Sequence, residues 1–180
     1  LRKAQPRPQS MAASQLSGPV FKVVIIGGVA AGPKVAAKIM RLRPNAQVTI
    51  IEKGRLLSYA GCGLPFYVSG IVQNQYQLMS SPAGLVRDPV FFQKIKNVRI
   101  LNQTEAVTIN RANKTVAIRD LVSQRQSLIE YDKLVLAAGS APIIPAIPGN
   151  QLKNIFTLHG PADAEGIKAT LETSKARDVI

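Results

Sequence analysis

Three features in the first third of the chain have the residue types and spacing that nucleotide and redox chemistry require. The first is a turn of small residues that directly follows the apolar run Val23-Val24-Ile25-Ile26. The turn consists of Gly27, Gly28, Val29, Ala30, Ala31 and Gly32. The second is Glu52, 20 residues after Gly32 at the end of another apolar run, and the third is Cys62, the only cysteine.

The glycine turn has the spacing of a pyrophosphate site. In dinucleotide-binding turns one glycine permits the tight turn, a second lets the backbone approach the pyrophosphate, and a third allows close helix packing. Gly27 and Gly32 take the first and third places here, whereas Val29 takes the second. A carboxylate at Glu52 can accept both hydrogen bonds of an adenosine ribose, which favours FAD or NAD over NADP. A glycine-rich turn with an unrelated surface glutamate remains the alternative.

Cys62 follows a glycine and precedes a short stretch that could be helical. Cysteines beside unpaired N–H groups at a helix start are often reactive. A lone cysteine can equally be a buried and inert residue, so its spacing alone leaves both interpretations open.

The elements that must position these residues can be read from hydrophobic periodicity. We expect a strand at Phe21–Ile26, a helix at Pro33–Arg43 and a strand at Gln47–Ile51, which together form a right-handed parallel unit. A short helix should follow Cys62 and end at Val68 or Ser69. Asp88 and Pro89 are typical of the start of a helix, here over Val90–Lys96.

The second half of the chain predicts a change from parallel to antiparallel pairing. Three short alternating runs predict an antiparallel meander, at Glu105–Ile109, Thr115–Arg119 and Ser127–Tyr131. The elements expected after it are a buried strand at Leu134–Ala137, a strand at Ile155–Leu158, a helix at Ala162–Thr173 and the first residues of another strand at Val179-Ile180. The pattern as a whole indicates an α/β fold with a central parallel sheet and an antiparallel β-meander.

Composition limits the classes of protein that remain. The 180 residues are 46% hydrophobic, which suits one domain with an ordinary core, and no apolar run reaches the roughly 20 residues of a membrane span. One cysteine excludes a disulfide-stapled module and favours a reducing compartment, for which we expect the cytoplasm. The net charge of +13 suggests nucleic-acid binding, but aromatic residues make up only 5% and the basic residues are dispersed. We therefore expect neither nucleic acid nor a membrane as partner, and no metal site.

Four motifs in order carry a resemblance to a known family. They are Gly27 to Gly32, Glu52-Lys53, the run Ser58-Tyr59-Ala60-Gly61-Cys62-Gly63-Leu64-Pro65-Phe66-Tyr67, and the run from Tyr131 to Pro142. Together they resemble the FAD-dependent pyridine nucleotide-disulfide oxidoreductases over residues 21 to 180. The most similar branch has a single redox cysteine and contains coenzyme A disulfide reductase, NADH oxidase and NADH peroxidase.

The resemblance implies a Rossmann-like FAD-binding domain and assigns roles to residues. Cys62 would be the catalytic residue, facing the flavin. The residues implied to bind FAD are Gly27, Gly28, Val29, Ala30, Ala31, Gly32, Glu52, Lys53, Ser58, Glu105, Ala106, Val107, Ala137, Ala138, Gly139 and Ser140. On the first helix, Lys38 and Arg41 match positions that contact the nucleotide of coenzyme A, and a solvated helix face is the alternative for both.

The implied activity is an NAD(P)H-dependent disulfide reductase. Electrons would pass from NADH or NADPH through FAD to Cys62, which would reduce coenzyme A disulfide or a related small disulfide or persulfide. Leu57 and Tyr67, five residues on either side of Cys62, are not cysteines, so Cys62 has no second cysteine for an internal redox disulfide. Its redox partner must then be a small thiol, in a mixed disulfide, or oxygen, as a sulfenic acid. Peroxide-handling members carry a histidine where this chain has Ala30, which favours thiol chemistry.

This chain departs from the family pattern at two places, and two alternative functions remain. Gly61 replaces the usual asparagine before the cysteine, and His159-Gly160 replaces an Arg-Asn pair. NADH oxidase and a non-catalytic FAD-binding fragment remain alternative functions. Residues 1–19 are expected to be a disordered leader, and residues 20–180 the amino-terminal part of an FAD-binding domain that ends where an NAD-binding domain begins. We expect this truncated piece to lack the nicotinamide site and to be inactive alone, and the full-length protein to be a homodimer.

Overall fold

The computed structural model describes residues 20–174. Its elements in chain order are β1 (Lys22–Ile26), α1 (Ala31–Leu42), β2 (Gln47–Ile51), the 3₁₀ helix η2 (Gly61–Gly63), α2 (Leu64–Val68), the 3₁₀ helix η3 (Gln75–Met79), α3 (Pro89–Lys96), β3 (Val98–Leu101), β4 (Thr104–Asn110), β5 (Thr115–Asp120), β6 (Gln126–Glu130), β7 (Lys133–Leu136) and α4 (Pro161–Ser174). The expected strands and helices that border the glycine turn are present within two residues of their predicted bounds.

A parallel four-stranded sheet in the order β3-β2-β1-β7 forms the centre of the fold. The register pairs Ile25 of β1 with Ile50 of β2 on one side and with Val135 of β7 on the other. Because all four strands are parallel, their carboxyl ends lie at one edge, and the turn that follows β1 and Glu52 after β2 meet there.

Successive residues of β1 face opposite layers. Val23 and Ile25 belong to a core packed against α1 and α3, whereas Val24 belongs to a second core shared with Val116 and Ile118 of the meander. The sheet is therefore buried on both faces, which explains its continuous β-branched runs. The meander itself has the order β4-β5-β6 with antiparallel pairing, as predicted.

Residues at the amino ends of α1 and α3 are of types that favour the start of a helix. The first turn of α1 contains Pro33, which costs nothing there because N–H groups in a first turn have no partner within the helix. The Asp88 side chain accepts a hydrogen bond from the Phe91 N–H at 2.7 Å and so caps α3, as the sequence predicted.

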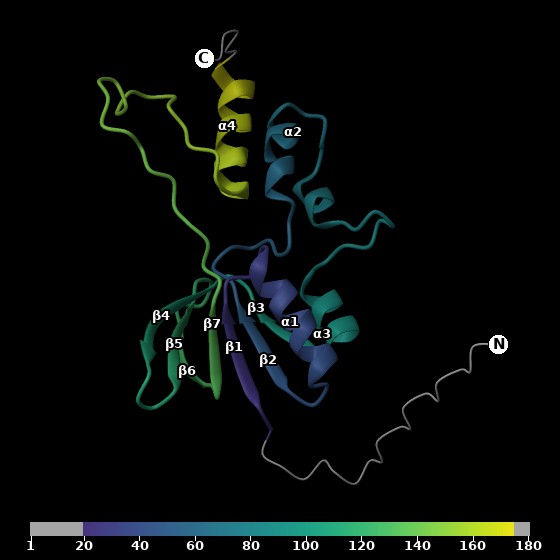
Figure 1. The fold of residues 1–180 in the computed structure, drawn as a ribbon. Coiled ribbons are helices and arrows are strands. Elements are labelled where there is room, and N and C mark those ends of the chain that lie inside the picture. Colours follow the sequence, from purple (N-terminus) through teal and green to yellow (C-terminus); the bar gives the residue numbers. More distant parts are fainter. Residues whose placement is uncertain (1–19, 175–180) are drawn as a thin grey trace, which may run out of the picture.

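Two predicted elements differ in the structure, and one observed strand, β3, was not predicted. β7 was expected to be buried, but it lies at the edge of the sheet and Leu136 is 68% exposed. Residues Ile155–Leu158 do not form a strand, because the long connection from β7 to α4 runs away from the sheet and finds no strand to pair with (Figure 1). β3 was missed because its four residues follow α3 directly and include Arg99, which interrupts the apolar pattern.

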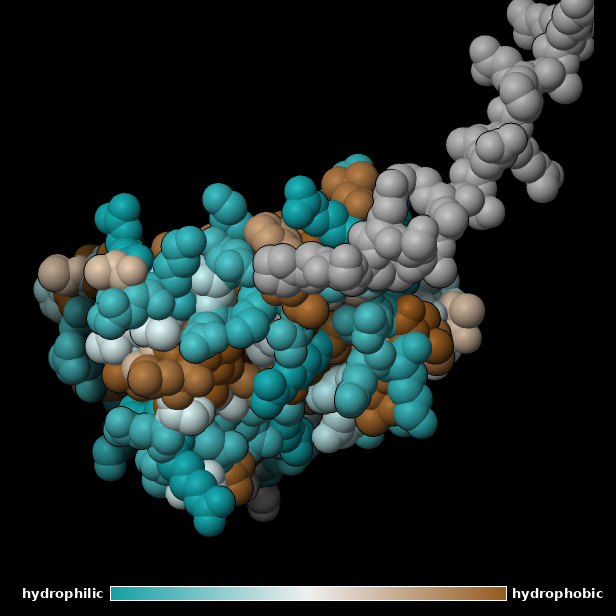
Figure 2. All heavy atoms as spheres, turned by 90° about the horizontal axis from the view of Figure 1, so that it is seen from below, coloured by the Kyte–Doolittle hydropathy of each residue, from teal (hydrophilic) through white to brown (hydrophobic). Residues whose placement is uncertain are grey.

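Two expectations lie outside the described residues, namely the leader at 1–19 and the strand beginning at Val179-Ile180. Among residues 20–174, none of the helices has the length and hydrophobicity to cross a membrane. Seen from below, most of the surface is polar and the hydrophobic side chains form separate patches (Figure 2).

Candidate functional site

The turn after β1 is closed so tightly that only glycine fits at two of its positions. Gly27 has φ +109°, and a Cβ there would lie 2.0 Å from the Ala137 carbonyl oxygen. A Cβ on Gly32 would lie 1.9 Å from the Gly27 carbonyl oxygen. The first and third glycines of the predicted turn therefore serve the tight bend and the close packing of α1.

The amino end of α1 is left free for an anion. Its N-cap residue, Ala30, forms no side-chain capping bond, and its first turn contains no acidic residue. The first N–H groups of a helix lack partners within the helix and attract negative charge. These features fit a pyrophosphate, which binds at such helix ends in dinucleotide folds.

Glu52 lies directly beside the glycine turn. Its Oε2 accepts a hydrogen bond from the Gly28 N–H at 2.6 Å, and its Oε1 accepts one from the Gly54 N–H at 2.7 Å. An ionised carboxylate offers about four acceptor positions, so two remain for the hydroxyls of a ribose. The residues present thus fit the adenosine end of FAD. Gly54 was not predicted, although its spacing of two residues from Glu52 is a signal of a tight turn.

A second group of predicted residues meets at the start of β4. The Lys53 ammonium bonds one oxygen of Glu105 at 2.9 Å, and the Arg119 guanidinium bonds the other at 2.5 Å. The bonds from Lys53, and then those from Arg119, hold the pKa of Glu105 below its ordinary value of 4.5. Beside it, β4 has a register irregularity between Ala106 and Thr108, and Val107 is half exposed. Arg119 was missed, because only the β4–β5 pairing brings it to Glu105.

Cys62 is exposed and lies in the middle of η2, immediately before α2. The segment that leads to it is attached to the glycine turn, since the Ser58 N–H donates to the Gly28 carbonyl at 2.9 Å. Ser58 itself has a left-handed backbone with φ 47°. The structure therefore brings Ser58 to the glycine turn and places the thiol four residues further along.

The segment Ala137 to Ser140 starts at the same edge. The Ala137 N–H donates to the Ile26 carbonyl at 2.7 Å, next to Gly27. Ala138, Gly139 and Ser140 are exposed, and Gly139 has φ 76°. These residues, which were predicted to bind the cofactor, therefore form an exposed segment next to the glycine turn.

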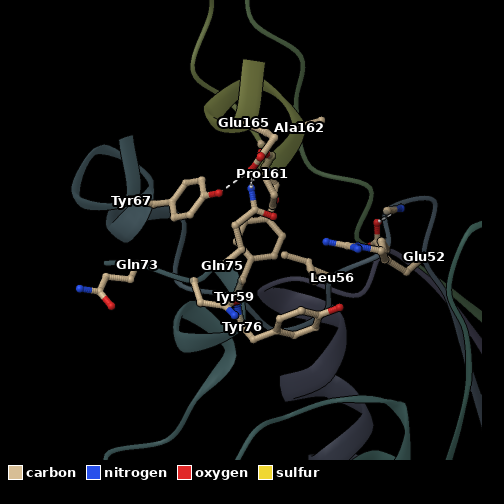
Figure 3. A pocket seen from close by; sticks show the side chains of 14 residues that line it. Glu52, Leu56, Tyr59, Tyr67, Gln73, Gln75, Tyr76, Pro161, Ala162 and Glu165 are labelled. Atoms are coloured by element: carbon tan, nitrogen blue, oxygen red, sulfur yellow. Dashed lines mark hydrogen bonds between the residues drawn. The ribbon is translucent and has the colours of Figure 1, made fainter. Parts of the chain in front are cut away.

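A pocket of about 590 Å³ opens on the other side of Glu52, between η3 and the start of α4 (Figure 3). Tyr59 lies at its centre, and Tyr67, Gln75 and Glu165 form the wall toward α2 (Figure 3). Burial, followed by the charges of Glu52 and Asp163, raises the pKa of the Tyr59 hydroxyl above its ordinary value of 10.0. Cys62 does not line this pocket.

The basic residues predicted to bind substrate lie on the outer face of α1. Lys38 and Arg41 are both exposed, and Lys34 stands one turn earlier on the same face. Lys34 was missed, although its spacing of four residues from Lys38 was visible in the sequence. His159 is exposed, and its backbone N–H donates to Asp163 at 2.8 Å.

Comparisons with known proteins found a matching family and similar proteins. The family described as pyridine nucleotide-disulphide oxidoreductase matches residues 21–179. The "NAD(P)H sulfur oxidoreductase (CoA-dependent)" of Pyrococcus abyssi is 34% identical over 158 residues, which are 88% of this chain and 33% of that protein. The NADH oxidase of Enterococcus faecalis is 36% identical over 161 residues, which are 89% of this chain and 34% of that protein.

A solved structure shows the same fold. The NAD-dependent persulfide reductase from A. fulgidus superimposes with a TM-score of 0.77 and 39% identity, covering 84% of this chain and 28% of that one. This chain therefore spans about a third of the length of the curated relatives that it matches.

Proposed function

Because this chain belongs to the pyridine nucleotide-disulphide oxidoreductase family, we propose that it supplies the FAD-binding turn and the redox cysteine of an NAD(P)H-dependent reductase of small disulfides. The substrate class proposed is coenzyme A disulfide or a coenzyme A persulfide. The observation that carries the proposal is the hydrogen bond from Ser58 to Gly28, because it ties the cysteine segment to the turn that fits a nucleotide.

We assign different residues of the chain to different parts of FAD and to coenzyme A. Gly27 to Gly32 and the amino end of α1 would bind the FAD pyrophosphate, and Glu52 would bind the ribose hydroxyls. Lys53 and the segment Glu105, Ala106 and Val107 would border the adenine. Ser58 and the exposed segment Ala137 to Ser140 would complete the cofactor site. Lys38 and Arg41 would bind the phosphates of coenzyme A, for which their cationic side chains are suited.

The proposed reaction has two steps. The Cys62 thiolate attacks one sulfur of the substrate disulfide, the S–S bond breaks, one thiolate leaves, and a mixed disulfide forms on Cys62. Two electrons and one proton then cleave that mixed disulfide, which restores the Cys62 thiolate and releases the second thiol. Bound FAD would supply the two electrons, taken from NADH or NADPH.

The first step can be tested on the chain itself, because it needs neither FAD nor NADPH. We expect one equivalent of coenzyme A to be released from coenzyme A disulfide and the protein mass to increase by one coenzyme A thiolate. Cys62→Ser should abolish both signals and leave FAD binding unchanged, as measured by quenching of flavin fluorescence. The proposal is wrong if the unaltered chain, with its thiol free, forms no mixed disulfide.

The proposed binding of coenzyme A by Lys38 and Arg41 can be tested separately with a double variant. Lys38→Gln combined with Arg41→Gln should slow the reaction with coenzyme A disulfide about tenfold, while the reaction with uncharged hydroxyethyl disulfide keeps its rate. Arg111→Gln combined with Arg125→Gln removes the same charge from exposed positions in the meander and serves as the control. Equal slowing in both double variants would exclude a specific role for α1.

The similarity to an NADH oxidase supports a second candidate, in which oxygen is the acceptor. Ala30 argues against oxygen as the acceptor, because the NADH oxidases and peroxidases that this chain resembles have a histidine at that position. Oxygen consumption by the FAD-loaded full-length protein with NADH separates the two candidates. We further propose that the 180 residues alone do not turn over NAD(P)H, and that the full-length protein is a cytoplasmic homodimer.

A further inference from the structure

The elements α2, η3 and α4 meet in a polar junction formed by Tyr67, Gln75 and Glu165 (Figure 3). The Tyr67 hydroxyl of α2 donates to Glu165 Oε2 of α4 at 2.5 Å. The Gln75 amide of η3 donates to the same oxygen at 3.1 Å and to the Pro161 carbonyl at 2.9 Å. One carboxylate oxygen therefore joins α2, η3 and α4.

The two donors of this junction are buried, whereas the acceptor Glu165 is an exposed residue. Tyr67 is 6% exposed and Gln75 is 8% exposed, and Leu64, Leu78 and Ala164 pack beside them. Buried polar groups are costly without a partner, and bonds to a carboxylate are among the stronger ones. The junction is therefore a directional contact that fixes the relative position of the three elements.

We call residues Ala60 to Gly63 the cysteine turn, and this turn is attached directly to η3 and α2. Cys62 lies between Ala60 and Gly63, and the Gly63 N–H donates to the Ala60 carbonyl at 2.9 Å across it. The Ala60 N–H donates to the Leu78 carbonyl of η3, also at 2.9 Å. On its other side the turn continues into α2, which begins at Leu64.

The turn and α2 have little stability of their own. α2 has five residues, and isolated helices of that length do not persist in water. Cys62 itself is exposed and is not held by burial. The position of Cys62 therefore depends on the backbone contacts of the residues on either side of it.

We propose that Tyr67, Gln75 and Glu165 are positioning residues for Cys62, holding the backbone segment that carries it in place through α2 and η3. The inference deepens the proposed role of Cys62. It is independent of the substrate, because it concerns the orientation of the turn and not the reaction at sulfur. In agreement, the hydrogen bond to Glu165, followed by burial, raises the pKa of Tyr67 above 10.0.

The single cysteine makes the test direct, since a nitroxide spin label can be attached at Cys62 alone. Tyr67→Phe and Glu165→Ala should each increase the mobile fraction of the label spectrum at least about twofold, because each removes a partly buried bond to the shared oxygen. Glu165→Gln should lie between Glu165→Ala and the unaltered chain, since its amide oxygen can still accept both donors.

Matched controls separate the junction from general loosening. Tyr76→Phe removes a tyrosine hydroxyl from η3, and Glu172→Gln removes an exposed carboxylate from α4. Both should leave the label spectrum unchanged. Label spectra of Tyr67→Phe and Glu165→Ala that superimpose on that of the unaltered chain would overturn the proposal.

A second readout does not depend on the label or on the Ala variant. Subtracting the ultraviolet titration of Tyr67→Phe from that of the unaltered chain gives the ionisation of Tyr67 alone. In Glu165→Gln this ionisation should shift to lower pH, toward 10.0. An unshifted titration would show that the bond is not formed in solution, and the proposal would then fall whatever the outcome for coenzyme A disulfide.

Discussion

Gly32→Ala tests the close packing of α1 against the glycine turn. The residue lies in the first turn of α1, where alanine is normally the better helix former. Its added methyl group would lie 1.9 Å from the Gly27 carbonyl oxygen and 3.2 Å from Cγ2 of Ile25. Backbone atoms form the closer contact, so no side-chain rotation can relieve it.

The expected cost follows from that contact. Inserting a methylene into a well-packed site costs about 1–3 kcal/mol. The upper end applies here, because α1 must move away from β1 as a whole. A loss of about 3 kcal/mol is a large part of a typical unfolding free energy of roughly 5–15 kcal/mol. It would shift the urea midpoint downward by about 1–3 M for m-values of roughly 1–3 kcal/mol/M.

Gly166→Ala is the matched control. Gly166 is also helical, in α4, and a Cβ there would meet nothing within 4 Å. This substitution should stabilise the chain by about 0.5–1 kcal/mol, the usual gain for alanine over glycine in a helix. Urea unfolding followed by far-ultraviolet circular dichroism measures both changes, and flavin fluorescence quenching measures FAD affinity in native conditions.

The two variants should move in opposite directions in stability, and FAD affinity should fall only in Gly32→Ala. The reasoning is refuted if Gly32→Ala unfolds at the same urea concentration as the unaltered chain and binds FAD equally well. That result would mean that α1 does not pack closely against the turn in solution.

Two further predictions concern the carboxylates of the site. Glu52→Gln should weaken FAD binding about tenfold or more, since a bond to a charged acceptor contributes about 1.5–3 kcal/mol, and flavin fluorescence quenching will measure it. The pKa of Glu105 is lowered by its bonds to Lys53 and Arg119, so the stability that it contributes is present above its unfolded value of 4.5 and is lost as pH falls below that value. Glu105→Gln should therefore reduce the loss of stability between pH 4.5 and lower pH in thermal unfolding, and an unchanged acid profile would contradict the pairing.

Much of the site was predictable because its geometry is a local property of the backbone. The glycines of the turn are required by φ at Gly27 and by a contact only five residues away at Gly32. Glu52 was predictable because a parallel β-α-β unit returns the chain to the same edge of the sheet. Strand and helix periods placed β1, α1 and β2, and turn residues placed the meander.

The tertiary structure alone decided which distant side chains meet. The Lys53–Glu105 pair joins residues 52 positions apart, and the Tyr67–Glu165 bond joins residues 98 positions apart. No periodicity encodes such partners, because they depend on the path that the chain takes between them. The same holds for β7, whose apolar residues predict burial but whose place at the edge of the sheet leaves Leu136 exposed. The sequence by itself thus determined the glycine turn and the place of Cys62 after it, whereas only the tertiary structure brings Tyr67, Gln75 and Glu165 together.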